Sequence, residues 1–325
     1  MEYRSLPGTD LVFSCVGFDG FTVGSNWQNT MGEKQRVRLL EEAFHLGINF
    51  FDTADVYGEG YGEELLAKAF KKNRHNVIIG TKFGYDFHDP ASLLNFDKPV
   101  QRFDKQFLRS ACEWSLRRLK TDYIDLYQIH DPPSNAVDSA EMFLLLDDLV
   151  YEGKIRHYGA AFTQGINADI DVIELLNRTN VSALQVPFKL LDDEEDNKIL
   201  TLAQQKETGL IARLSNAMRK ASYSAAYADP DCYGRYPNAD CNTVNMESKK
   251  GFWIDHQLFY DEFGITSTQF EINVHLNNLL IRSVLGDIAS RSELFEHIAA
   301  VDTKKITSEE IDVLRGLFVG ELRVD

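Results

Sequence analysis

The chain has 325 residues, and its 50 Asp and Glu outnumber its 34 Lys and Arg to give a formal net charge of −16. Such an acidic chain repels phosphate backbones, so nucleic-acid binding is not expected, and a phosphate-bearing cofactor would need a local basic pocket. Its mean hydropathy is −0.28, without a long apolar run or an N-terminal signal segment. We therefore expect a cytoplasmic protein that does not bind membranes.

Short apolar segments alternate along the chain with segments of helical periodicity. A turn at residues 6–10 predicts a β-hairpin at the start of the chain, before the alternating segments begin. The expected barrel strands cover residues 13–18, 48–51, 77–81, 123–129, 157–160, 183–187, 210–213 and 279–285. The expected helices cover residues 33–46, 63–72, 104–119, 136–152, 170–177, 194–207, 266–277, 290–300 and 308–317.

Eight strands that alternate with helices predict an α/β fold, the (β/α)8 TIM barrel, as a single domain over residues 1–325. The hairpin is expected to cap the closed end of the barrel. Two segments lack regular patterns. We interpret residues 83–103 as a long loop at the mouth, and residues 215–261 as a large insertion after the seventh strand.

Three successive predicted strands end in an ionisable residue: Asp52, Lys82 and His130. Tyr57 follows Asp52 by five positions, in a loop that leads through a Gly-rich turn to a helix. Active sites of parallel α/β folds lie at the carboxyl ends of the strands, so these four side chains are expected to converge as a catalytic tetrad.

The four residue types suit proton delivery to a developing alkoxide. A phenol has a pKa of about 10, and an ammonium at Lys82 would lower the pKa of Tyr57. Asp52 would pair with Lys82 and hold it in place. His130 could donate a hydrogen bond to a substrate carbonyl oxygen and polarise it. Side chains supply no hydride, so a reduction would require a nicotinamide.

Three segments carry a resemblance to the aldo-keto reductase superfamily, in their order and in their spacing. They are Asn49-Phe50-Phe51-Asp52-Thr53-Ala54-Asp55-Val56-Tyr57-Gly58, Gly80-Thr81-Lys82-Phe83-Gly84 and Tyr123-Ile124-Asp125-Leu126-Tyr127-Gln128-Ile129-His130. The resemblance implies an NADP(H)-dependent oxidoreductase that interconverts a small-molecule carbonyl and an alcohol. Tyr57 would be the acid and base, Lys82 and Asp52 would tune it, and His130 would orient the carbonyl.

The resemblance also implies where NADP(H) would bind, and it implies no metal site. The expected contacts come from the first, sixth and seventh strands or the residues just after them, and from the helix that follows the eighth strand. They are Gly20, Phe21, Gln185, Arg213, Ser215, Arg291, Glu296 and His297. In the family, small and basic residues after the eighth strand take the adenosine 2′-phosphate.

The segments for cofactor binding depart from the family pattern. The fifth strand ends in Gly159-Ala160-Ala161-Phe162, without the usual Ser and Asn, and residues 215–220 lack the usual Gly. Asp287 follows Gly286, where the family has small or basic residues, and His297 stands where Asn is usual. Two alternatives follow. One is a non-redox lyase, dehydratase or epimerase that uses the tetrad without exchangeable NADP(H); the other is a pseudoenzyme.

Overall fold

The computed structural model describes residues 1–25, 31–88, 100–137, 139–162, 168–187, 194–214, 264–303, 305–307 and 309–310. Among them, eight parallel strands close into a barrel in the order β10-β11-β12-β3-β4-β5-β8-β9. These are β3 (Val16–Asp19), β4 (Phe50–Asp52), β5 (Ile78–Phe83), β8 (Ile124–His130), β9 (Ile155–Ala161), β10 (Ala183–Val186), β11 (Gly209–Arg213) and β12 (Ile281–Asp287). The predicted TIM-barrel fold is confirmed.

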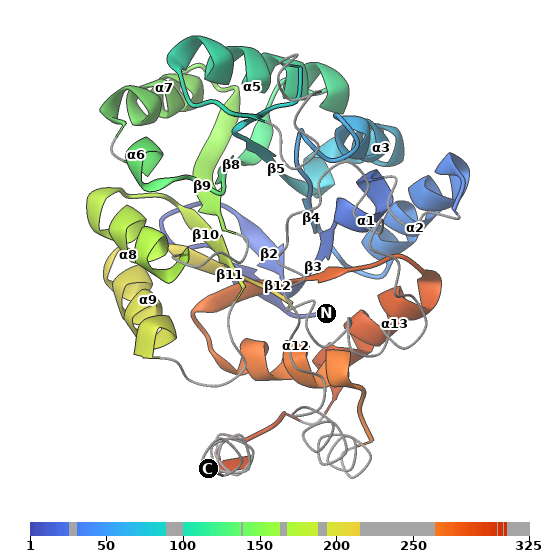
Figure 1. Cartoon of the computed structure of the whole chain (residues 1–325). Coiled ribbons are helices and arrows are strands. Elements are labelled where there is room, and N and C mark those ends of the chain that lie inside the picture. Colours follow the sequence, from blue (N-terminus) through green and yellow to red (C-terminus); the bar gives the residue numbers. More distant parts are fainter. Residues whose placement is uncertain are drawn as a thin grey trace, which may run out of the picture.

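Helices surround the barrel, as the view along its axis shows (Figure 1). They are α1 (Phe21–Gly24), α2 (Glu33–His45), α3 (Tyr61–Phe70), α5 (Lys105–Leu119), α6 (Ser134–Val137), α7 (Ala140–Tyr151), α8 (Ala168–Arg178), α9 (Glu194–Gln205), α12 (Ser267–Asn277) and α13 (Arg291–Ala299), with 3-10 turns η1 (Arg74–Asn76) and η3 (Ala300–Asp302). None of the described helices is long and apolar enough to cross a bilayer.

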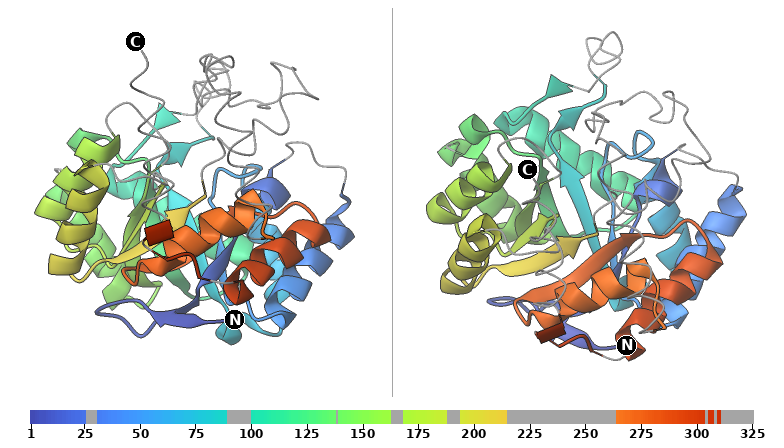
Figure 2. Two further views of the ribbon diagram at one scale, coloured as in Figure 1. Left: turned by 90° about the horizontal axis from the view of Figure 1, so that it is seen from below. Right: turned by 60° about the horizontal axis from the view of Figure 1, so that its bottom comes forward.

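The N-terminal hairpin closes one end of the barrel. Strands β1 (Tyr3–Ser5) and β2 (Val12–Ser14) pair antiparallel. Phe13 stacks on Phe50 of β4 with ring centroids 4.3 Å apart, and Leu6 and Leu11 are buried in the same cluster. Figure 2 shows this hairpin at the end of the barrel opposite to strands β6 (Tyr85–Asp86) and β7 (Val100–Gln101). The predicted cap is therefore confirmed, and the opposite end is the mouth.

The barrel interior changes from apolar to polar between the hairpin and the mouth. The layer against the hairpin contains one apolar residue from each of six strands: Phe50, Ile78, Leu126, Ala183, Ile211 and Leu285. Side chains on one face of a strand recur every two residues. The next inward layer is therefore Asp52, Gly80, Gln128, Gln185, Arg213 and Asp287, and one step further along lie Lys82 and His130.

The structure corrects several predicted boundaries. The predicted strand 13–18 is divided, because Phe13 belongs to the hairpin and the barrel strand begins at Val16. The predicted helix 136–152 is also divided, since the Ser139 side chain accepts a hydrogen bond from Met142 N and starts α7 anew. The predicted loop 83–103 contains the β6–β7 pair.

The predicted insertion at residues 215–261 lies outside the described residues, as does most of the predicted helix 308–317. The prediction of one domain over residues 1–325 stays a prediction. The predicted helix 104–119 corresponds to α5, whose N-cap Asp104 accepts a hydrogen bond of 3.0 Å from Phe107 N.

Candidate active site

Asp52 and Lys82 form a buried ion pair at the mouth. They end or nearly end the adjacent strands β4 and β5. Lys82 Nζ also donates to Thr53 O at 2.8 Å, and Gln128 Nε2 donates to Asp52 Oδ1 at 2.7 Å. Burial raises the pKa of Asp52, against the lowering effect of the Lys82 ammonium. The Asp52 carboxylate therefore contacts Lys82 of the adjacent strand β5 and Gln128 of β8, the strand beyond it.

Tyr57 lies in the turn after β4, where the backbone of the next residue packs closely against α1. Gly58 has a φ of 61°, and a Cβ there would lie 2.3 Å from Gly24 O of α1. The Phe21 ring packs edge-on against the Tyr57 ring at 5.1 Å. Lys82 Nζ lies 5.3 Å from the centroid of the Tyr57 ring, so the ammonium lies beside the phenol ring.

His130 completes the set from the end of β8. Its ring is nearly perpendicular to the Tyr57 ring, at 79° and 6.1 Å, and to the Tyr85 ring, at 83° and 5.0 Å. The Gln101 side chain fixes the backbone by donating to the carbonyl oxygens of His130 and Asp131. Burial lowers the pKa of His130 to about 3. The imidazole is therefore neutral and can donate one N–H to a ligand oxygen.

The pKa of Tyr57 is raised well above its ordinary value, chiefly by burial. The Arg213 guanidinium opposes this increase, and the carboxylates of Asp19, Asp52 and Asp287 add to it. The expectation of a lowered pKa is therefore wrong. The phenol is protonated at neutral pH, which is the state that a proton donor needs.

Two further carboxylates reach the mouth from β3 and β12. Asp19 Oδ2 forms an ion pair with Arg213 Nη2 at 3.0 Å, and Asp19 is aligned with both Asp287 and Asp52 in the barrel register. The five neighbouring strand ends β11, β12, β3, β4 and β5 thus carry Arg213, Asp287, Asp19, Asp52 and Lys82. Three acids stand against two cations, so this side of the rim has a net negative charge.

Asp19 and Gln128 contact residues of this site but are absent from the residues predicted for it. The signal that could have found Gln128 is the period of two, since it follows the inward Leu126 as Asp52 follows Phe50. Asp19 could have been found by its place at the end of the first barrel strand, which is the position that Asp52 has in the second.

Three of the predicted cofactor contacts, Gly20, Phe21 and Gln185, come from barrel strand ends around this rim. Gly20 N donates to Asp52 O at 2.7 Å, and Phe21 N donates to Asp19 Oδ1 at 2.9 Å. The Gln185 side chain is 1% exposed, and neither its amide nitrogen nor its amide oxygen has a hydrogen-bond partner among the described residues. A buried amide with both groups open suits another carboxamide, such as that of nicotinamide.

Three further predicted cofactor contacts, Arg291, Glu296 and His297, lie on α13 and contact other residues of the protein. Arg291 Nε pairs with Glu42 Oε1 of α2 at 2.6 Å. Glu296 accepts a hydrogen bond from Thr266 Oγ1 at 2.5 Å. His297 is buried against Gly286, where a Cβ would lie 2.2 Å from its Nε2. Ser215 lies outside the described residues.

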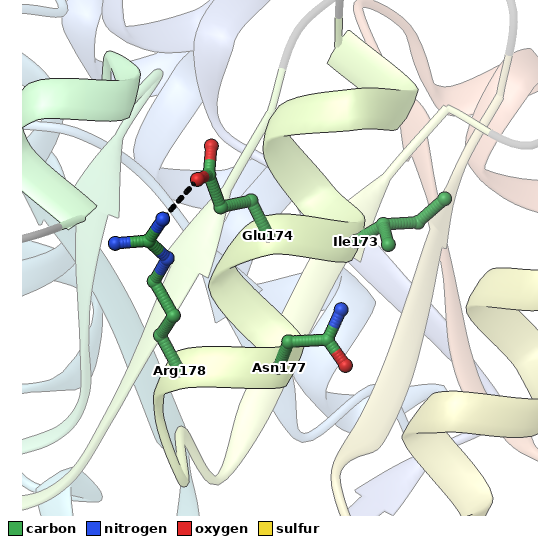
Figure 3. Close-up of a pocket in the computed structure, with 4 residues that line it drawn as sticks. All are labelled: Ile173, Glu174, Asn177 and Arg178. Atoms are coloured by element: carbon green, nitrogen blue, oxygen red, sulfur yellow. Dashed lines mark hydrogen bonds and ion pairs between the residues drawn. The ribbon is translucent and has the colours of Figure 1, made fainter.

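A hollow on the outer surface of α8 is distinct from the mouth. Its lining comes from one helix face: Ile173, Glu174, Asn177 and Arg178 (Figure 3). Arg178 and Glu174 pair with each other at 2.5 Å across one helical turn. The hollow brings together no residues from separate elements, so the mouth remains the candidate site.

Asp55 is a buried carboxyl group beside the tetrad whose Oδ1 has no hydrogen-bond partner within the described part of the chain. Burial, and then the nearby Glu63 carboxylate, raise its pKa well above the ordinary value. A group with a raised folded-state pKa destabilises the fold increasingly as the pH rises above the unfolded-state pKa.

Asp55→Asn is therefore expected to stabilise the chain relative to the wild type, by up to about 1.4 kcal/mol for each pH unit above about 4. Urea denaturation of both proteins between about pH 5 and pH 7 measures the difference. A difference in unfolding free energy that does not change with pH would contradict the raised pKa of Asp55.

Known proteins of one enzyme family resemble this chain in sequence. The model of the Aldo/keto reductase family matches residues 16–236. The oxidoreductase YqkF of Bacillus subtilis is 27% identical over 317 residues, which are 97% of this chain and 96% of that protein. The NADH-specific methylglyoxal reductase of Escherichia coli is 30% identical over 229 residues, which are 68% of either chain.

Solved structures share the fold over nearly the whole chain. The holo form of an aldo-keto reductase from Bacillus halodurans has a TM-score of 0.72 at 24% identity, and the match covers 98% of this chain and 96% of that one. An aldo/keto reductase of Klebsiella pneumoniae in complex with NADP and acetate has a TM-score of 0.66 at 21% identity, with the same coverage. Since the family model spans more than half of the chain, the protein belongs to the aldo/keto reductase family and is an oxidoreductase of that type.

Proposed function

We propose that the protein interconverts a small-molecule carbonyl compound and its alcohol with a nicotinamide dinucleotide, through Tyr57, Lys82, Asp52 and His130. The sequence predicted NADP(H) as that cofactor, and the NADP complex of the Klebsiella pneumoniae structure agrees with it. The observation that carries the proposal is the convergence at one barrel rim of a buried ammonium, a protonated phenol and a neutral imidazole.

Each of the four side chains has a separate part in this reaction. When bound, a nicotinamide would supply or accept the hydride at the carbonyl carbon. His130 donates its N–H to the carbonyl oxygen and orients the substrate. Tyr57 then gives its phenolic proton to the developing alkoxide. The Lys82 ammonium, held by Asp52 and Thr53 O, stabilises the phenolate that this transfer leaves behind.

Gln185 supports the proposed binding of a nicotinamide cofactor. Its buried amide could donate to the carbonyl oxygen and accept from the amide nitrogen of the nicotinamide carboxamide. Arg213 lies on the neighbouring strand β11 and brings positive charge toward the same part of the mouth. Both residues are inward-facing members of the layer that contains Asp52.

The test is carbonyl-dependent oxidation of NADH and of NADPH with a panel of short aldehydes and ketones. We expect loss of the reduced-nicotinamide absorbance and formation of an equal amount of alcohol. The reverse assay uses the oxidised dinucleotides and the alcohols. If no carbonyl is reduced but solvent deuterium enters the substrate next to its carbonyl group, the protein uses the tetrad for proton transfer alone.

A further inference from the structure

The turn between β12 and α13 lies at the position where many TIM barrels bind phosphate. In chain order β11 and β12 are the seventh and eighth barrel strands, and α13 begins after a short turn. Phosphate sites of this fold are frequently made by the loops after these two strands and by a helix N-terminus. A helix N-terminus attracts anions because its backbone N–H groups lack partners within the helix.

In this protein a side chain of α13 itself occupies the position at the helix N-terminus where an anion would bind. Glu293, in the first turn of α13, accepts a hydrogen bond of 2.7 Å from Ala289 N through its Oε2. The N-cap Ser290 accepts from Glu293 N at 3.2 Å. The carboxylate therefore satisfies a donor that would otherwise face a bound anion, and it adds a negative charge of its own.

The surrounding charges also disfavour phosphate. Asp287 starts the turn, and Ile288, which follows it, is fully buried. Arg291 is the one cation of residues 287–294, and Glu42 of α2 already neutralises it. Its guanidinium lies over the Phe295 ring, 5.1 Å from the centroid, with the side chain 70% exposed. Glu293 thus adds a carboxylate at the start of α13, and residues 287–294 contain no cation besides Arg291.

Resting on the proposed function, we propose that this turn makes the protein select NAD(H) over NADP(H), with Glu293 as the residue that determines the selectivity. The adenosine 2′-phosphate of NADP(H) would add roughly two negative charges to the turn. A 2′-hydroxyl is uncharged and can donate a hydrogen bond to a carboxylate, which is how dinucleotide folds recognise NAD with an acidic residue.

The selectivity concerns the adenosine end alone and leaves the nicotinamide end unchanged. Gln185 and the tetrad lie at the barrel mouth, where the two dinucleotides are chemically identical. NAD(H) therefore takes the place of the predicted NADP(H), and the proposed chemistry stays the same. It also predicts that the preference appears in equilibrium binding, before any turnover.

The test is fluorescence titration of the full chain with NADH and with NADPH, without a carbonyl substrate. For the wild type we expect NADH to bind at least about tenfold more tightly than NADPH, a difference of 1.4 kcal/mol. Glu293→Gln keeps the shape of the side chain and an acceptor for Ala289 N, but removes the charge. It is expected to lower the Kd for NADPH about threefold to tenfold and to change the Kd for NADH less than twofold.

The matched control is Glu141→Gln, which removes an exposed acid from the first turn of α7, on another side of the barrel. It should leave the ratio of the two Kd values unchanged. Equal or tighter binding of NADPH by the wild type would overturn the selectivity and leave the proposed function intact. Failure of both dinucleotides to bind up to millimolar concentration would overturn the proposed function as well.

Discussion

Tyr57→Phe is expected to lower kcat for carbonyl reduction by about 10²–10⁴-fold, the usual contribution of a positioned general acid. The substitution removes the proton and leaves the ring, which packs between Phe21 and His130. The Kd for the dinucleotide should therefore stay within about twofold of the wild-type value. Single-turnover kinetics with saturating dinucleotide separates the chemical step from binding and product release.

Tyr127→Phe is the control for this substitution. Tyr127 is fully buried on β8, stacks on Phe83, and its hydroxyl has no hydrogen-bond partner among the described residues. Its loss should leave kcat within about twofold of wild type. A Tyr57→Phe variant that retains more than about a tenth of wild-type kcat would exclude Tyr57 as the acid, and Tyr85, which packs on His130, would become the next candidate.

The pH dependence of kcat follows from the same site. Burial raises the pKa of Tyr57 and lowers the pKa of His130 to about 3. Neither group changes its charge between about pH 5 and pH 8, so both keep the protonation state that reduction requires. These two residues should therefore give no bell-shaped profile over that range.

The barrel could be predicted from the sequence because each strand carries its own local signal. The apolar, β-branched runs at Ile78–Phe83 and Ile124–His130 are short, and each has an ionisable residue at its last or next-to-last position. The tetrad followed from the same pattern, since parallel strands deliver their carboxyl ends to one rim. The period of two would have extended the prediction to Gln128, which holds Asp52.

Contacts between distant segments could not be predicted in this way. The pair Asp19–Arg213 exists because β12 brings the first and seventh barrel strands close together. The pair β6–β7 joins two-residue strands that have no periodic pattern of their own. The raised pKa of Tyr57 has the same origin, because burial and carboxylates from three strands outweigh the nearby cations. The sequence of a single segment does not show which residues of other strands will lie beside it.

Lys82→Met is expected to destabilise the protein by about 3–5 kcal/mol and to abolish carbonyl reduction. The substitution keeps the volume of the side chain but leaves the Asp52 carboxylate buried without its counter-charge, which is the costly way to break a buried ion pair. Within the described part of the chain, Gln128 is then the one side chain left that donates to Asp52. The loss should grow with pH, because the uncompensated Asp52 must take up a proton in the folded state above its unfolded-state pKa.

The double variant Asp52→Asn/Lys82→Met separates the two roles of this ion pair. Removing both charges leaves a neutral amide that can still accept from Gln128, so most of the lost stability should return. Activity should not return, because no ammonium then lies beside Tyr57 to stabilise the phenolate. Urea denaturation and kcat, measured on both variants, test the two statements independently. An active double variant would show that Lys82 stabilises the fold and has no part in the chemistry. A double variant as unstable as Lys82→Met would show that the buried charge on Asp52 is not what destabilises the single variant.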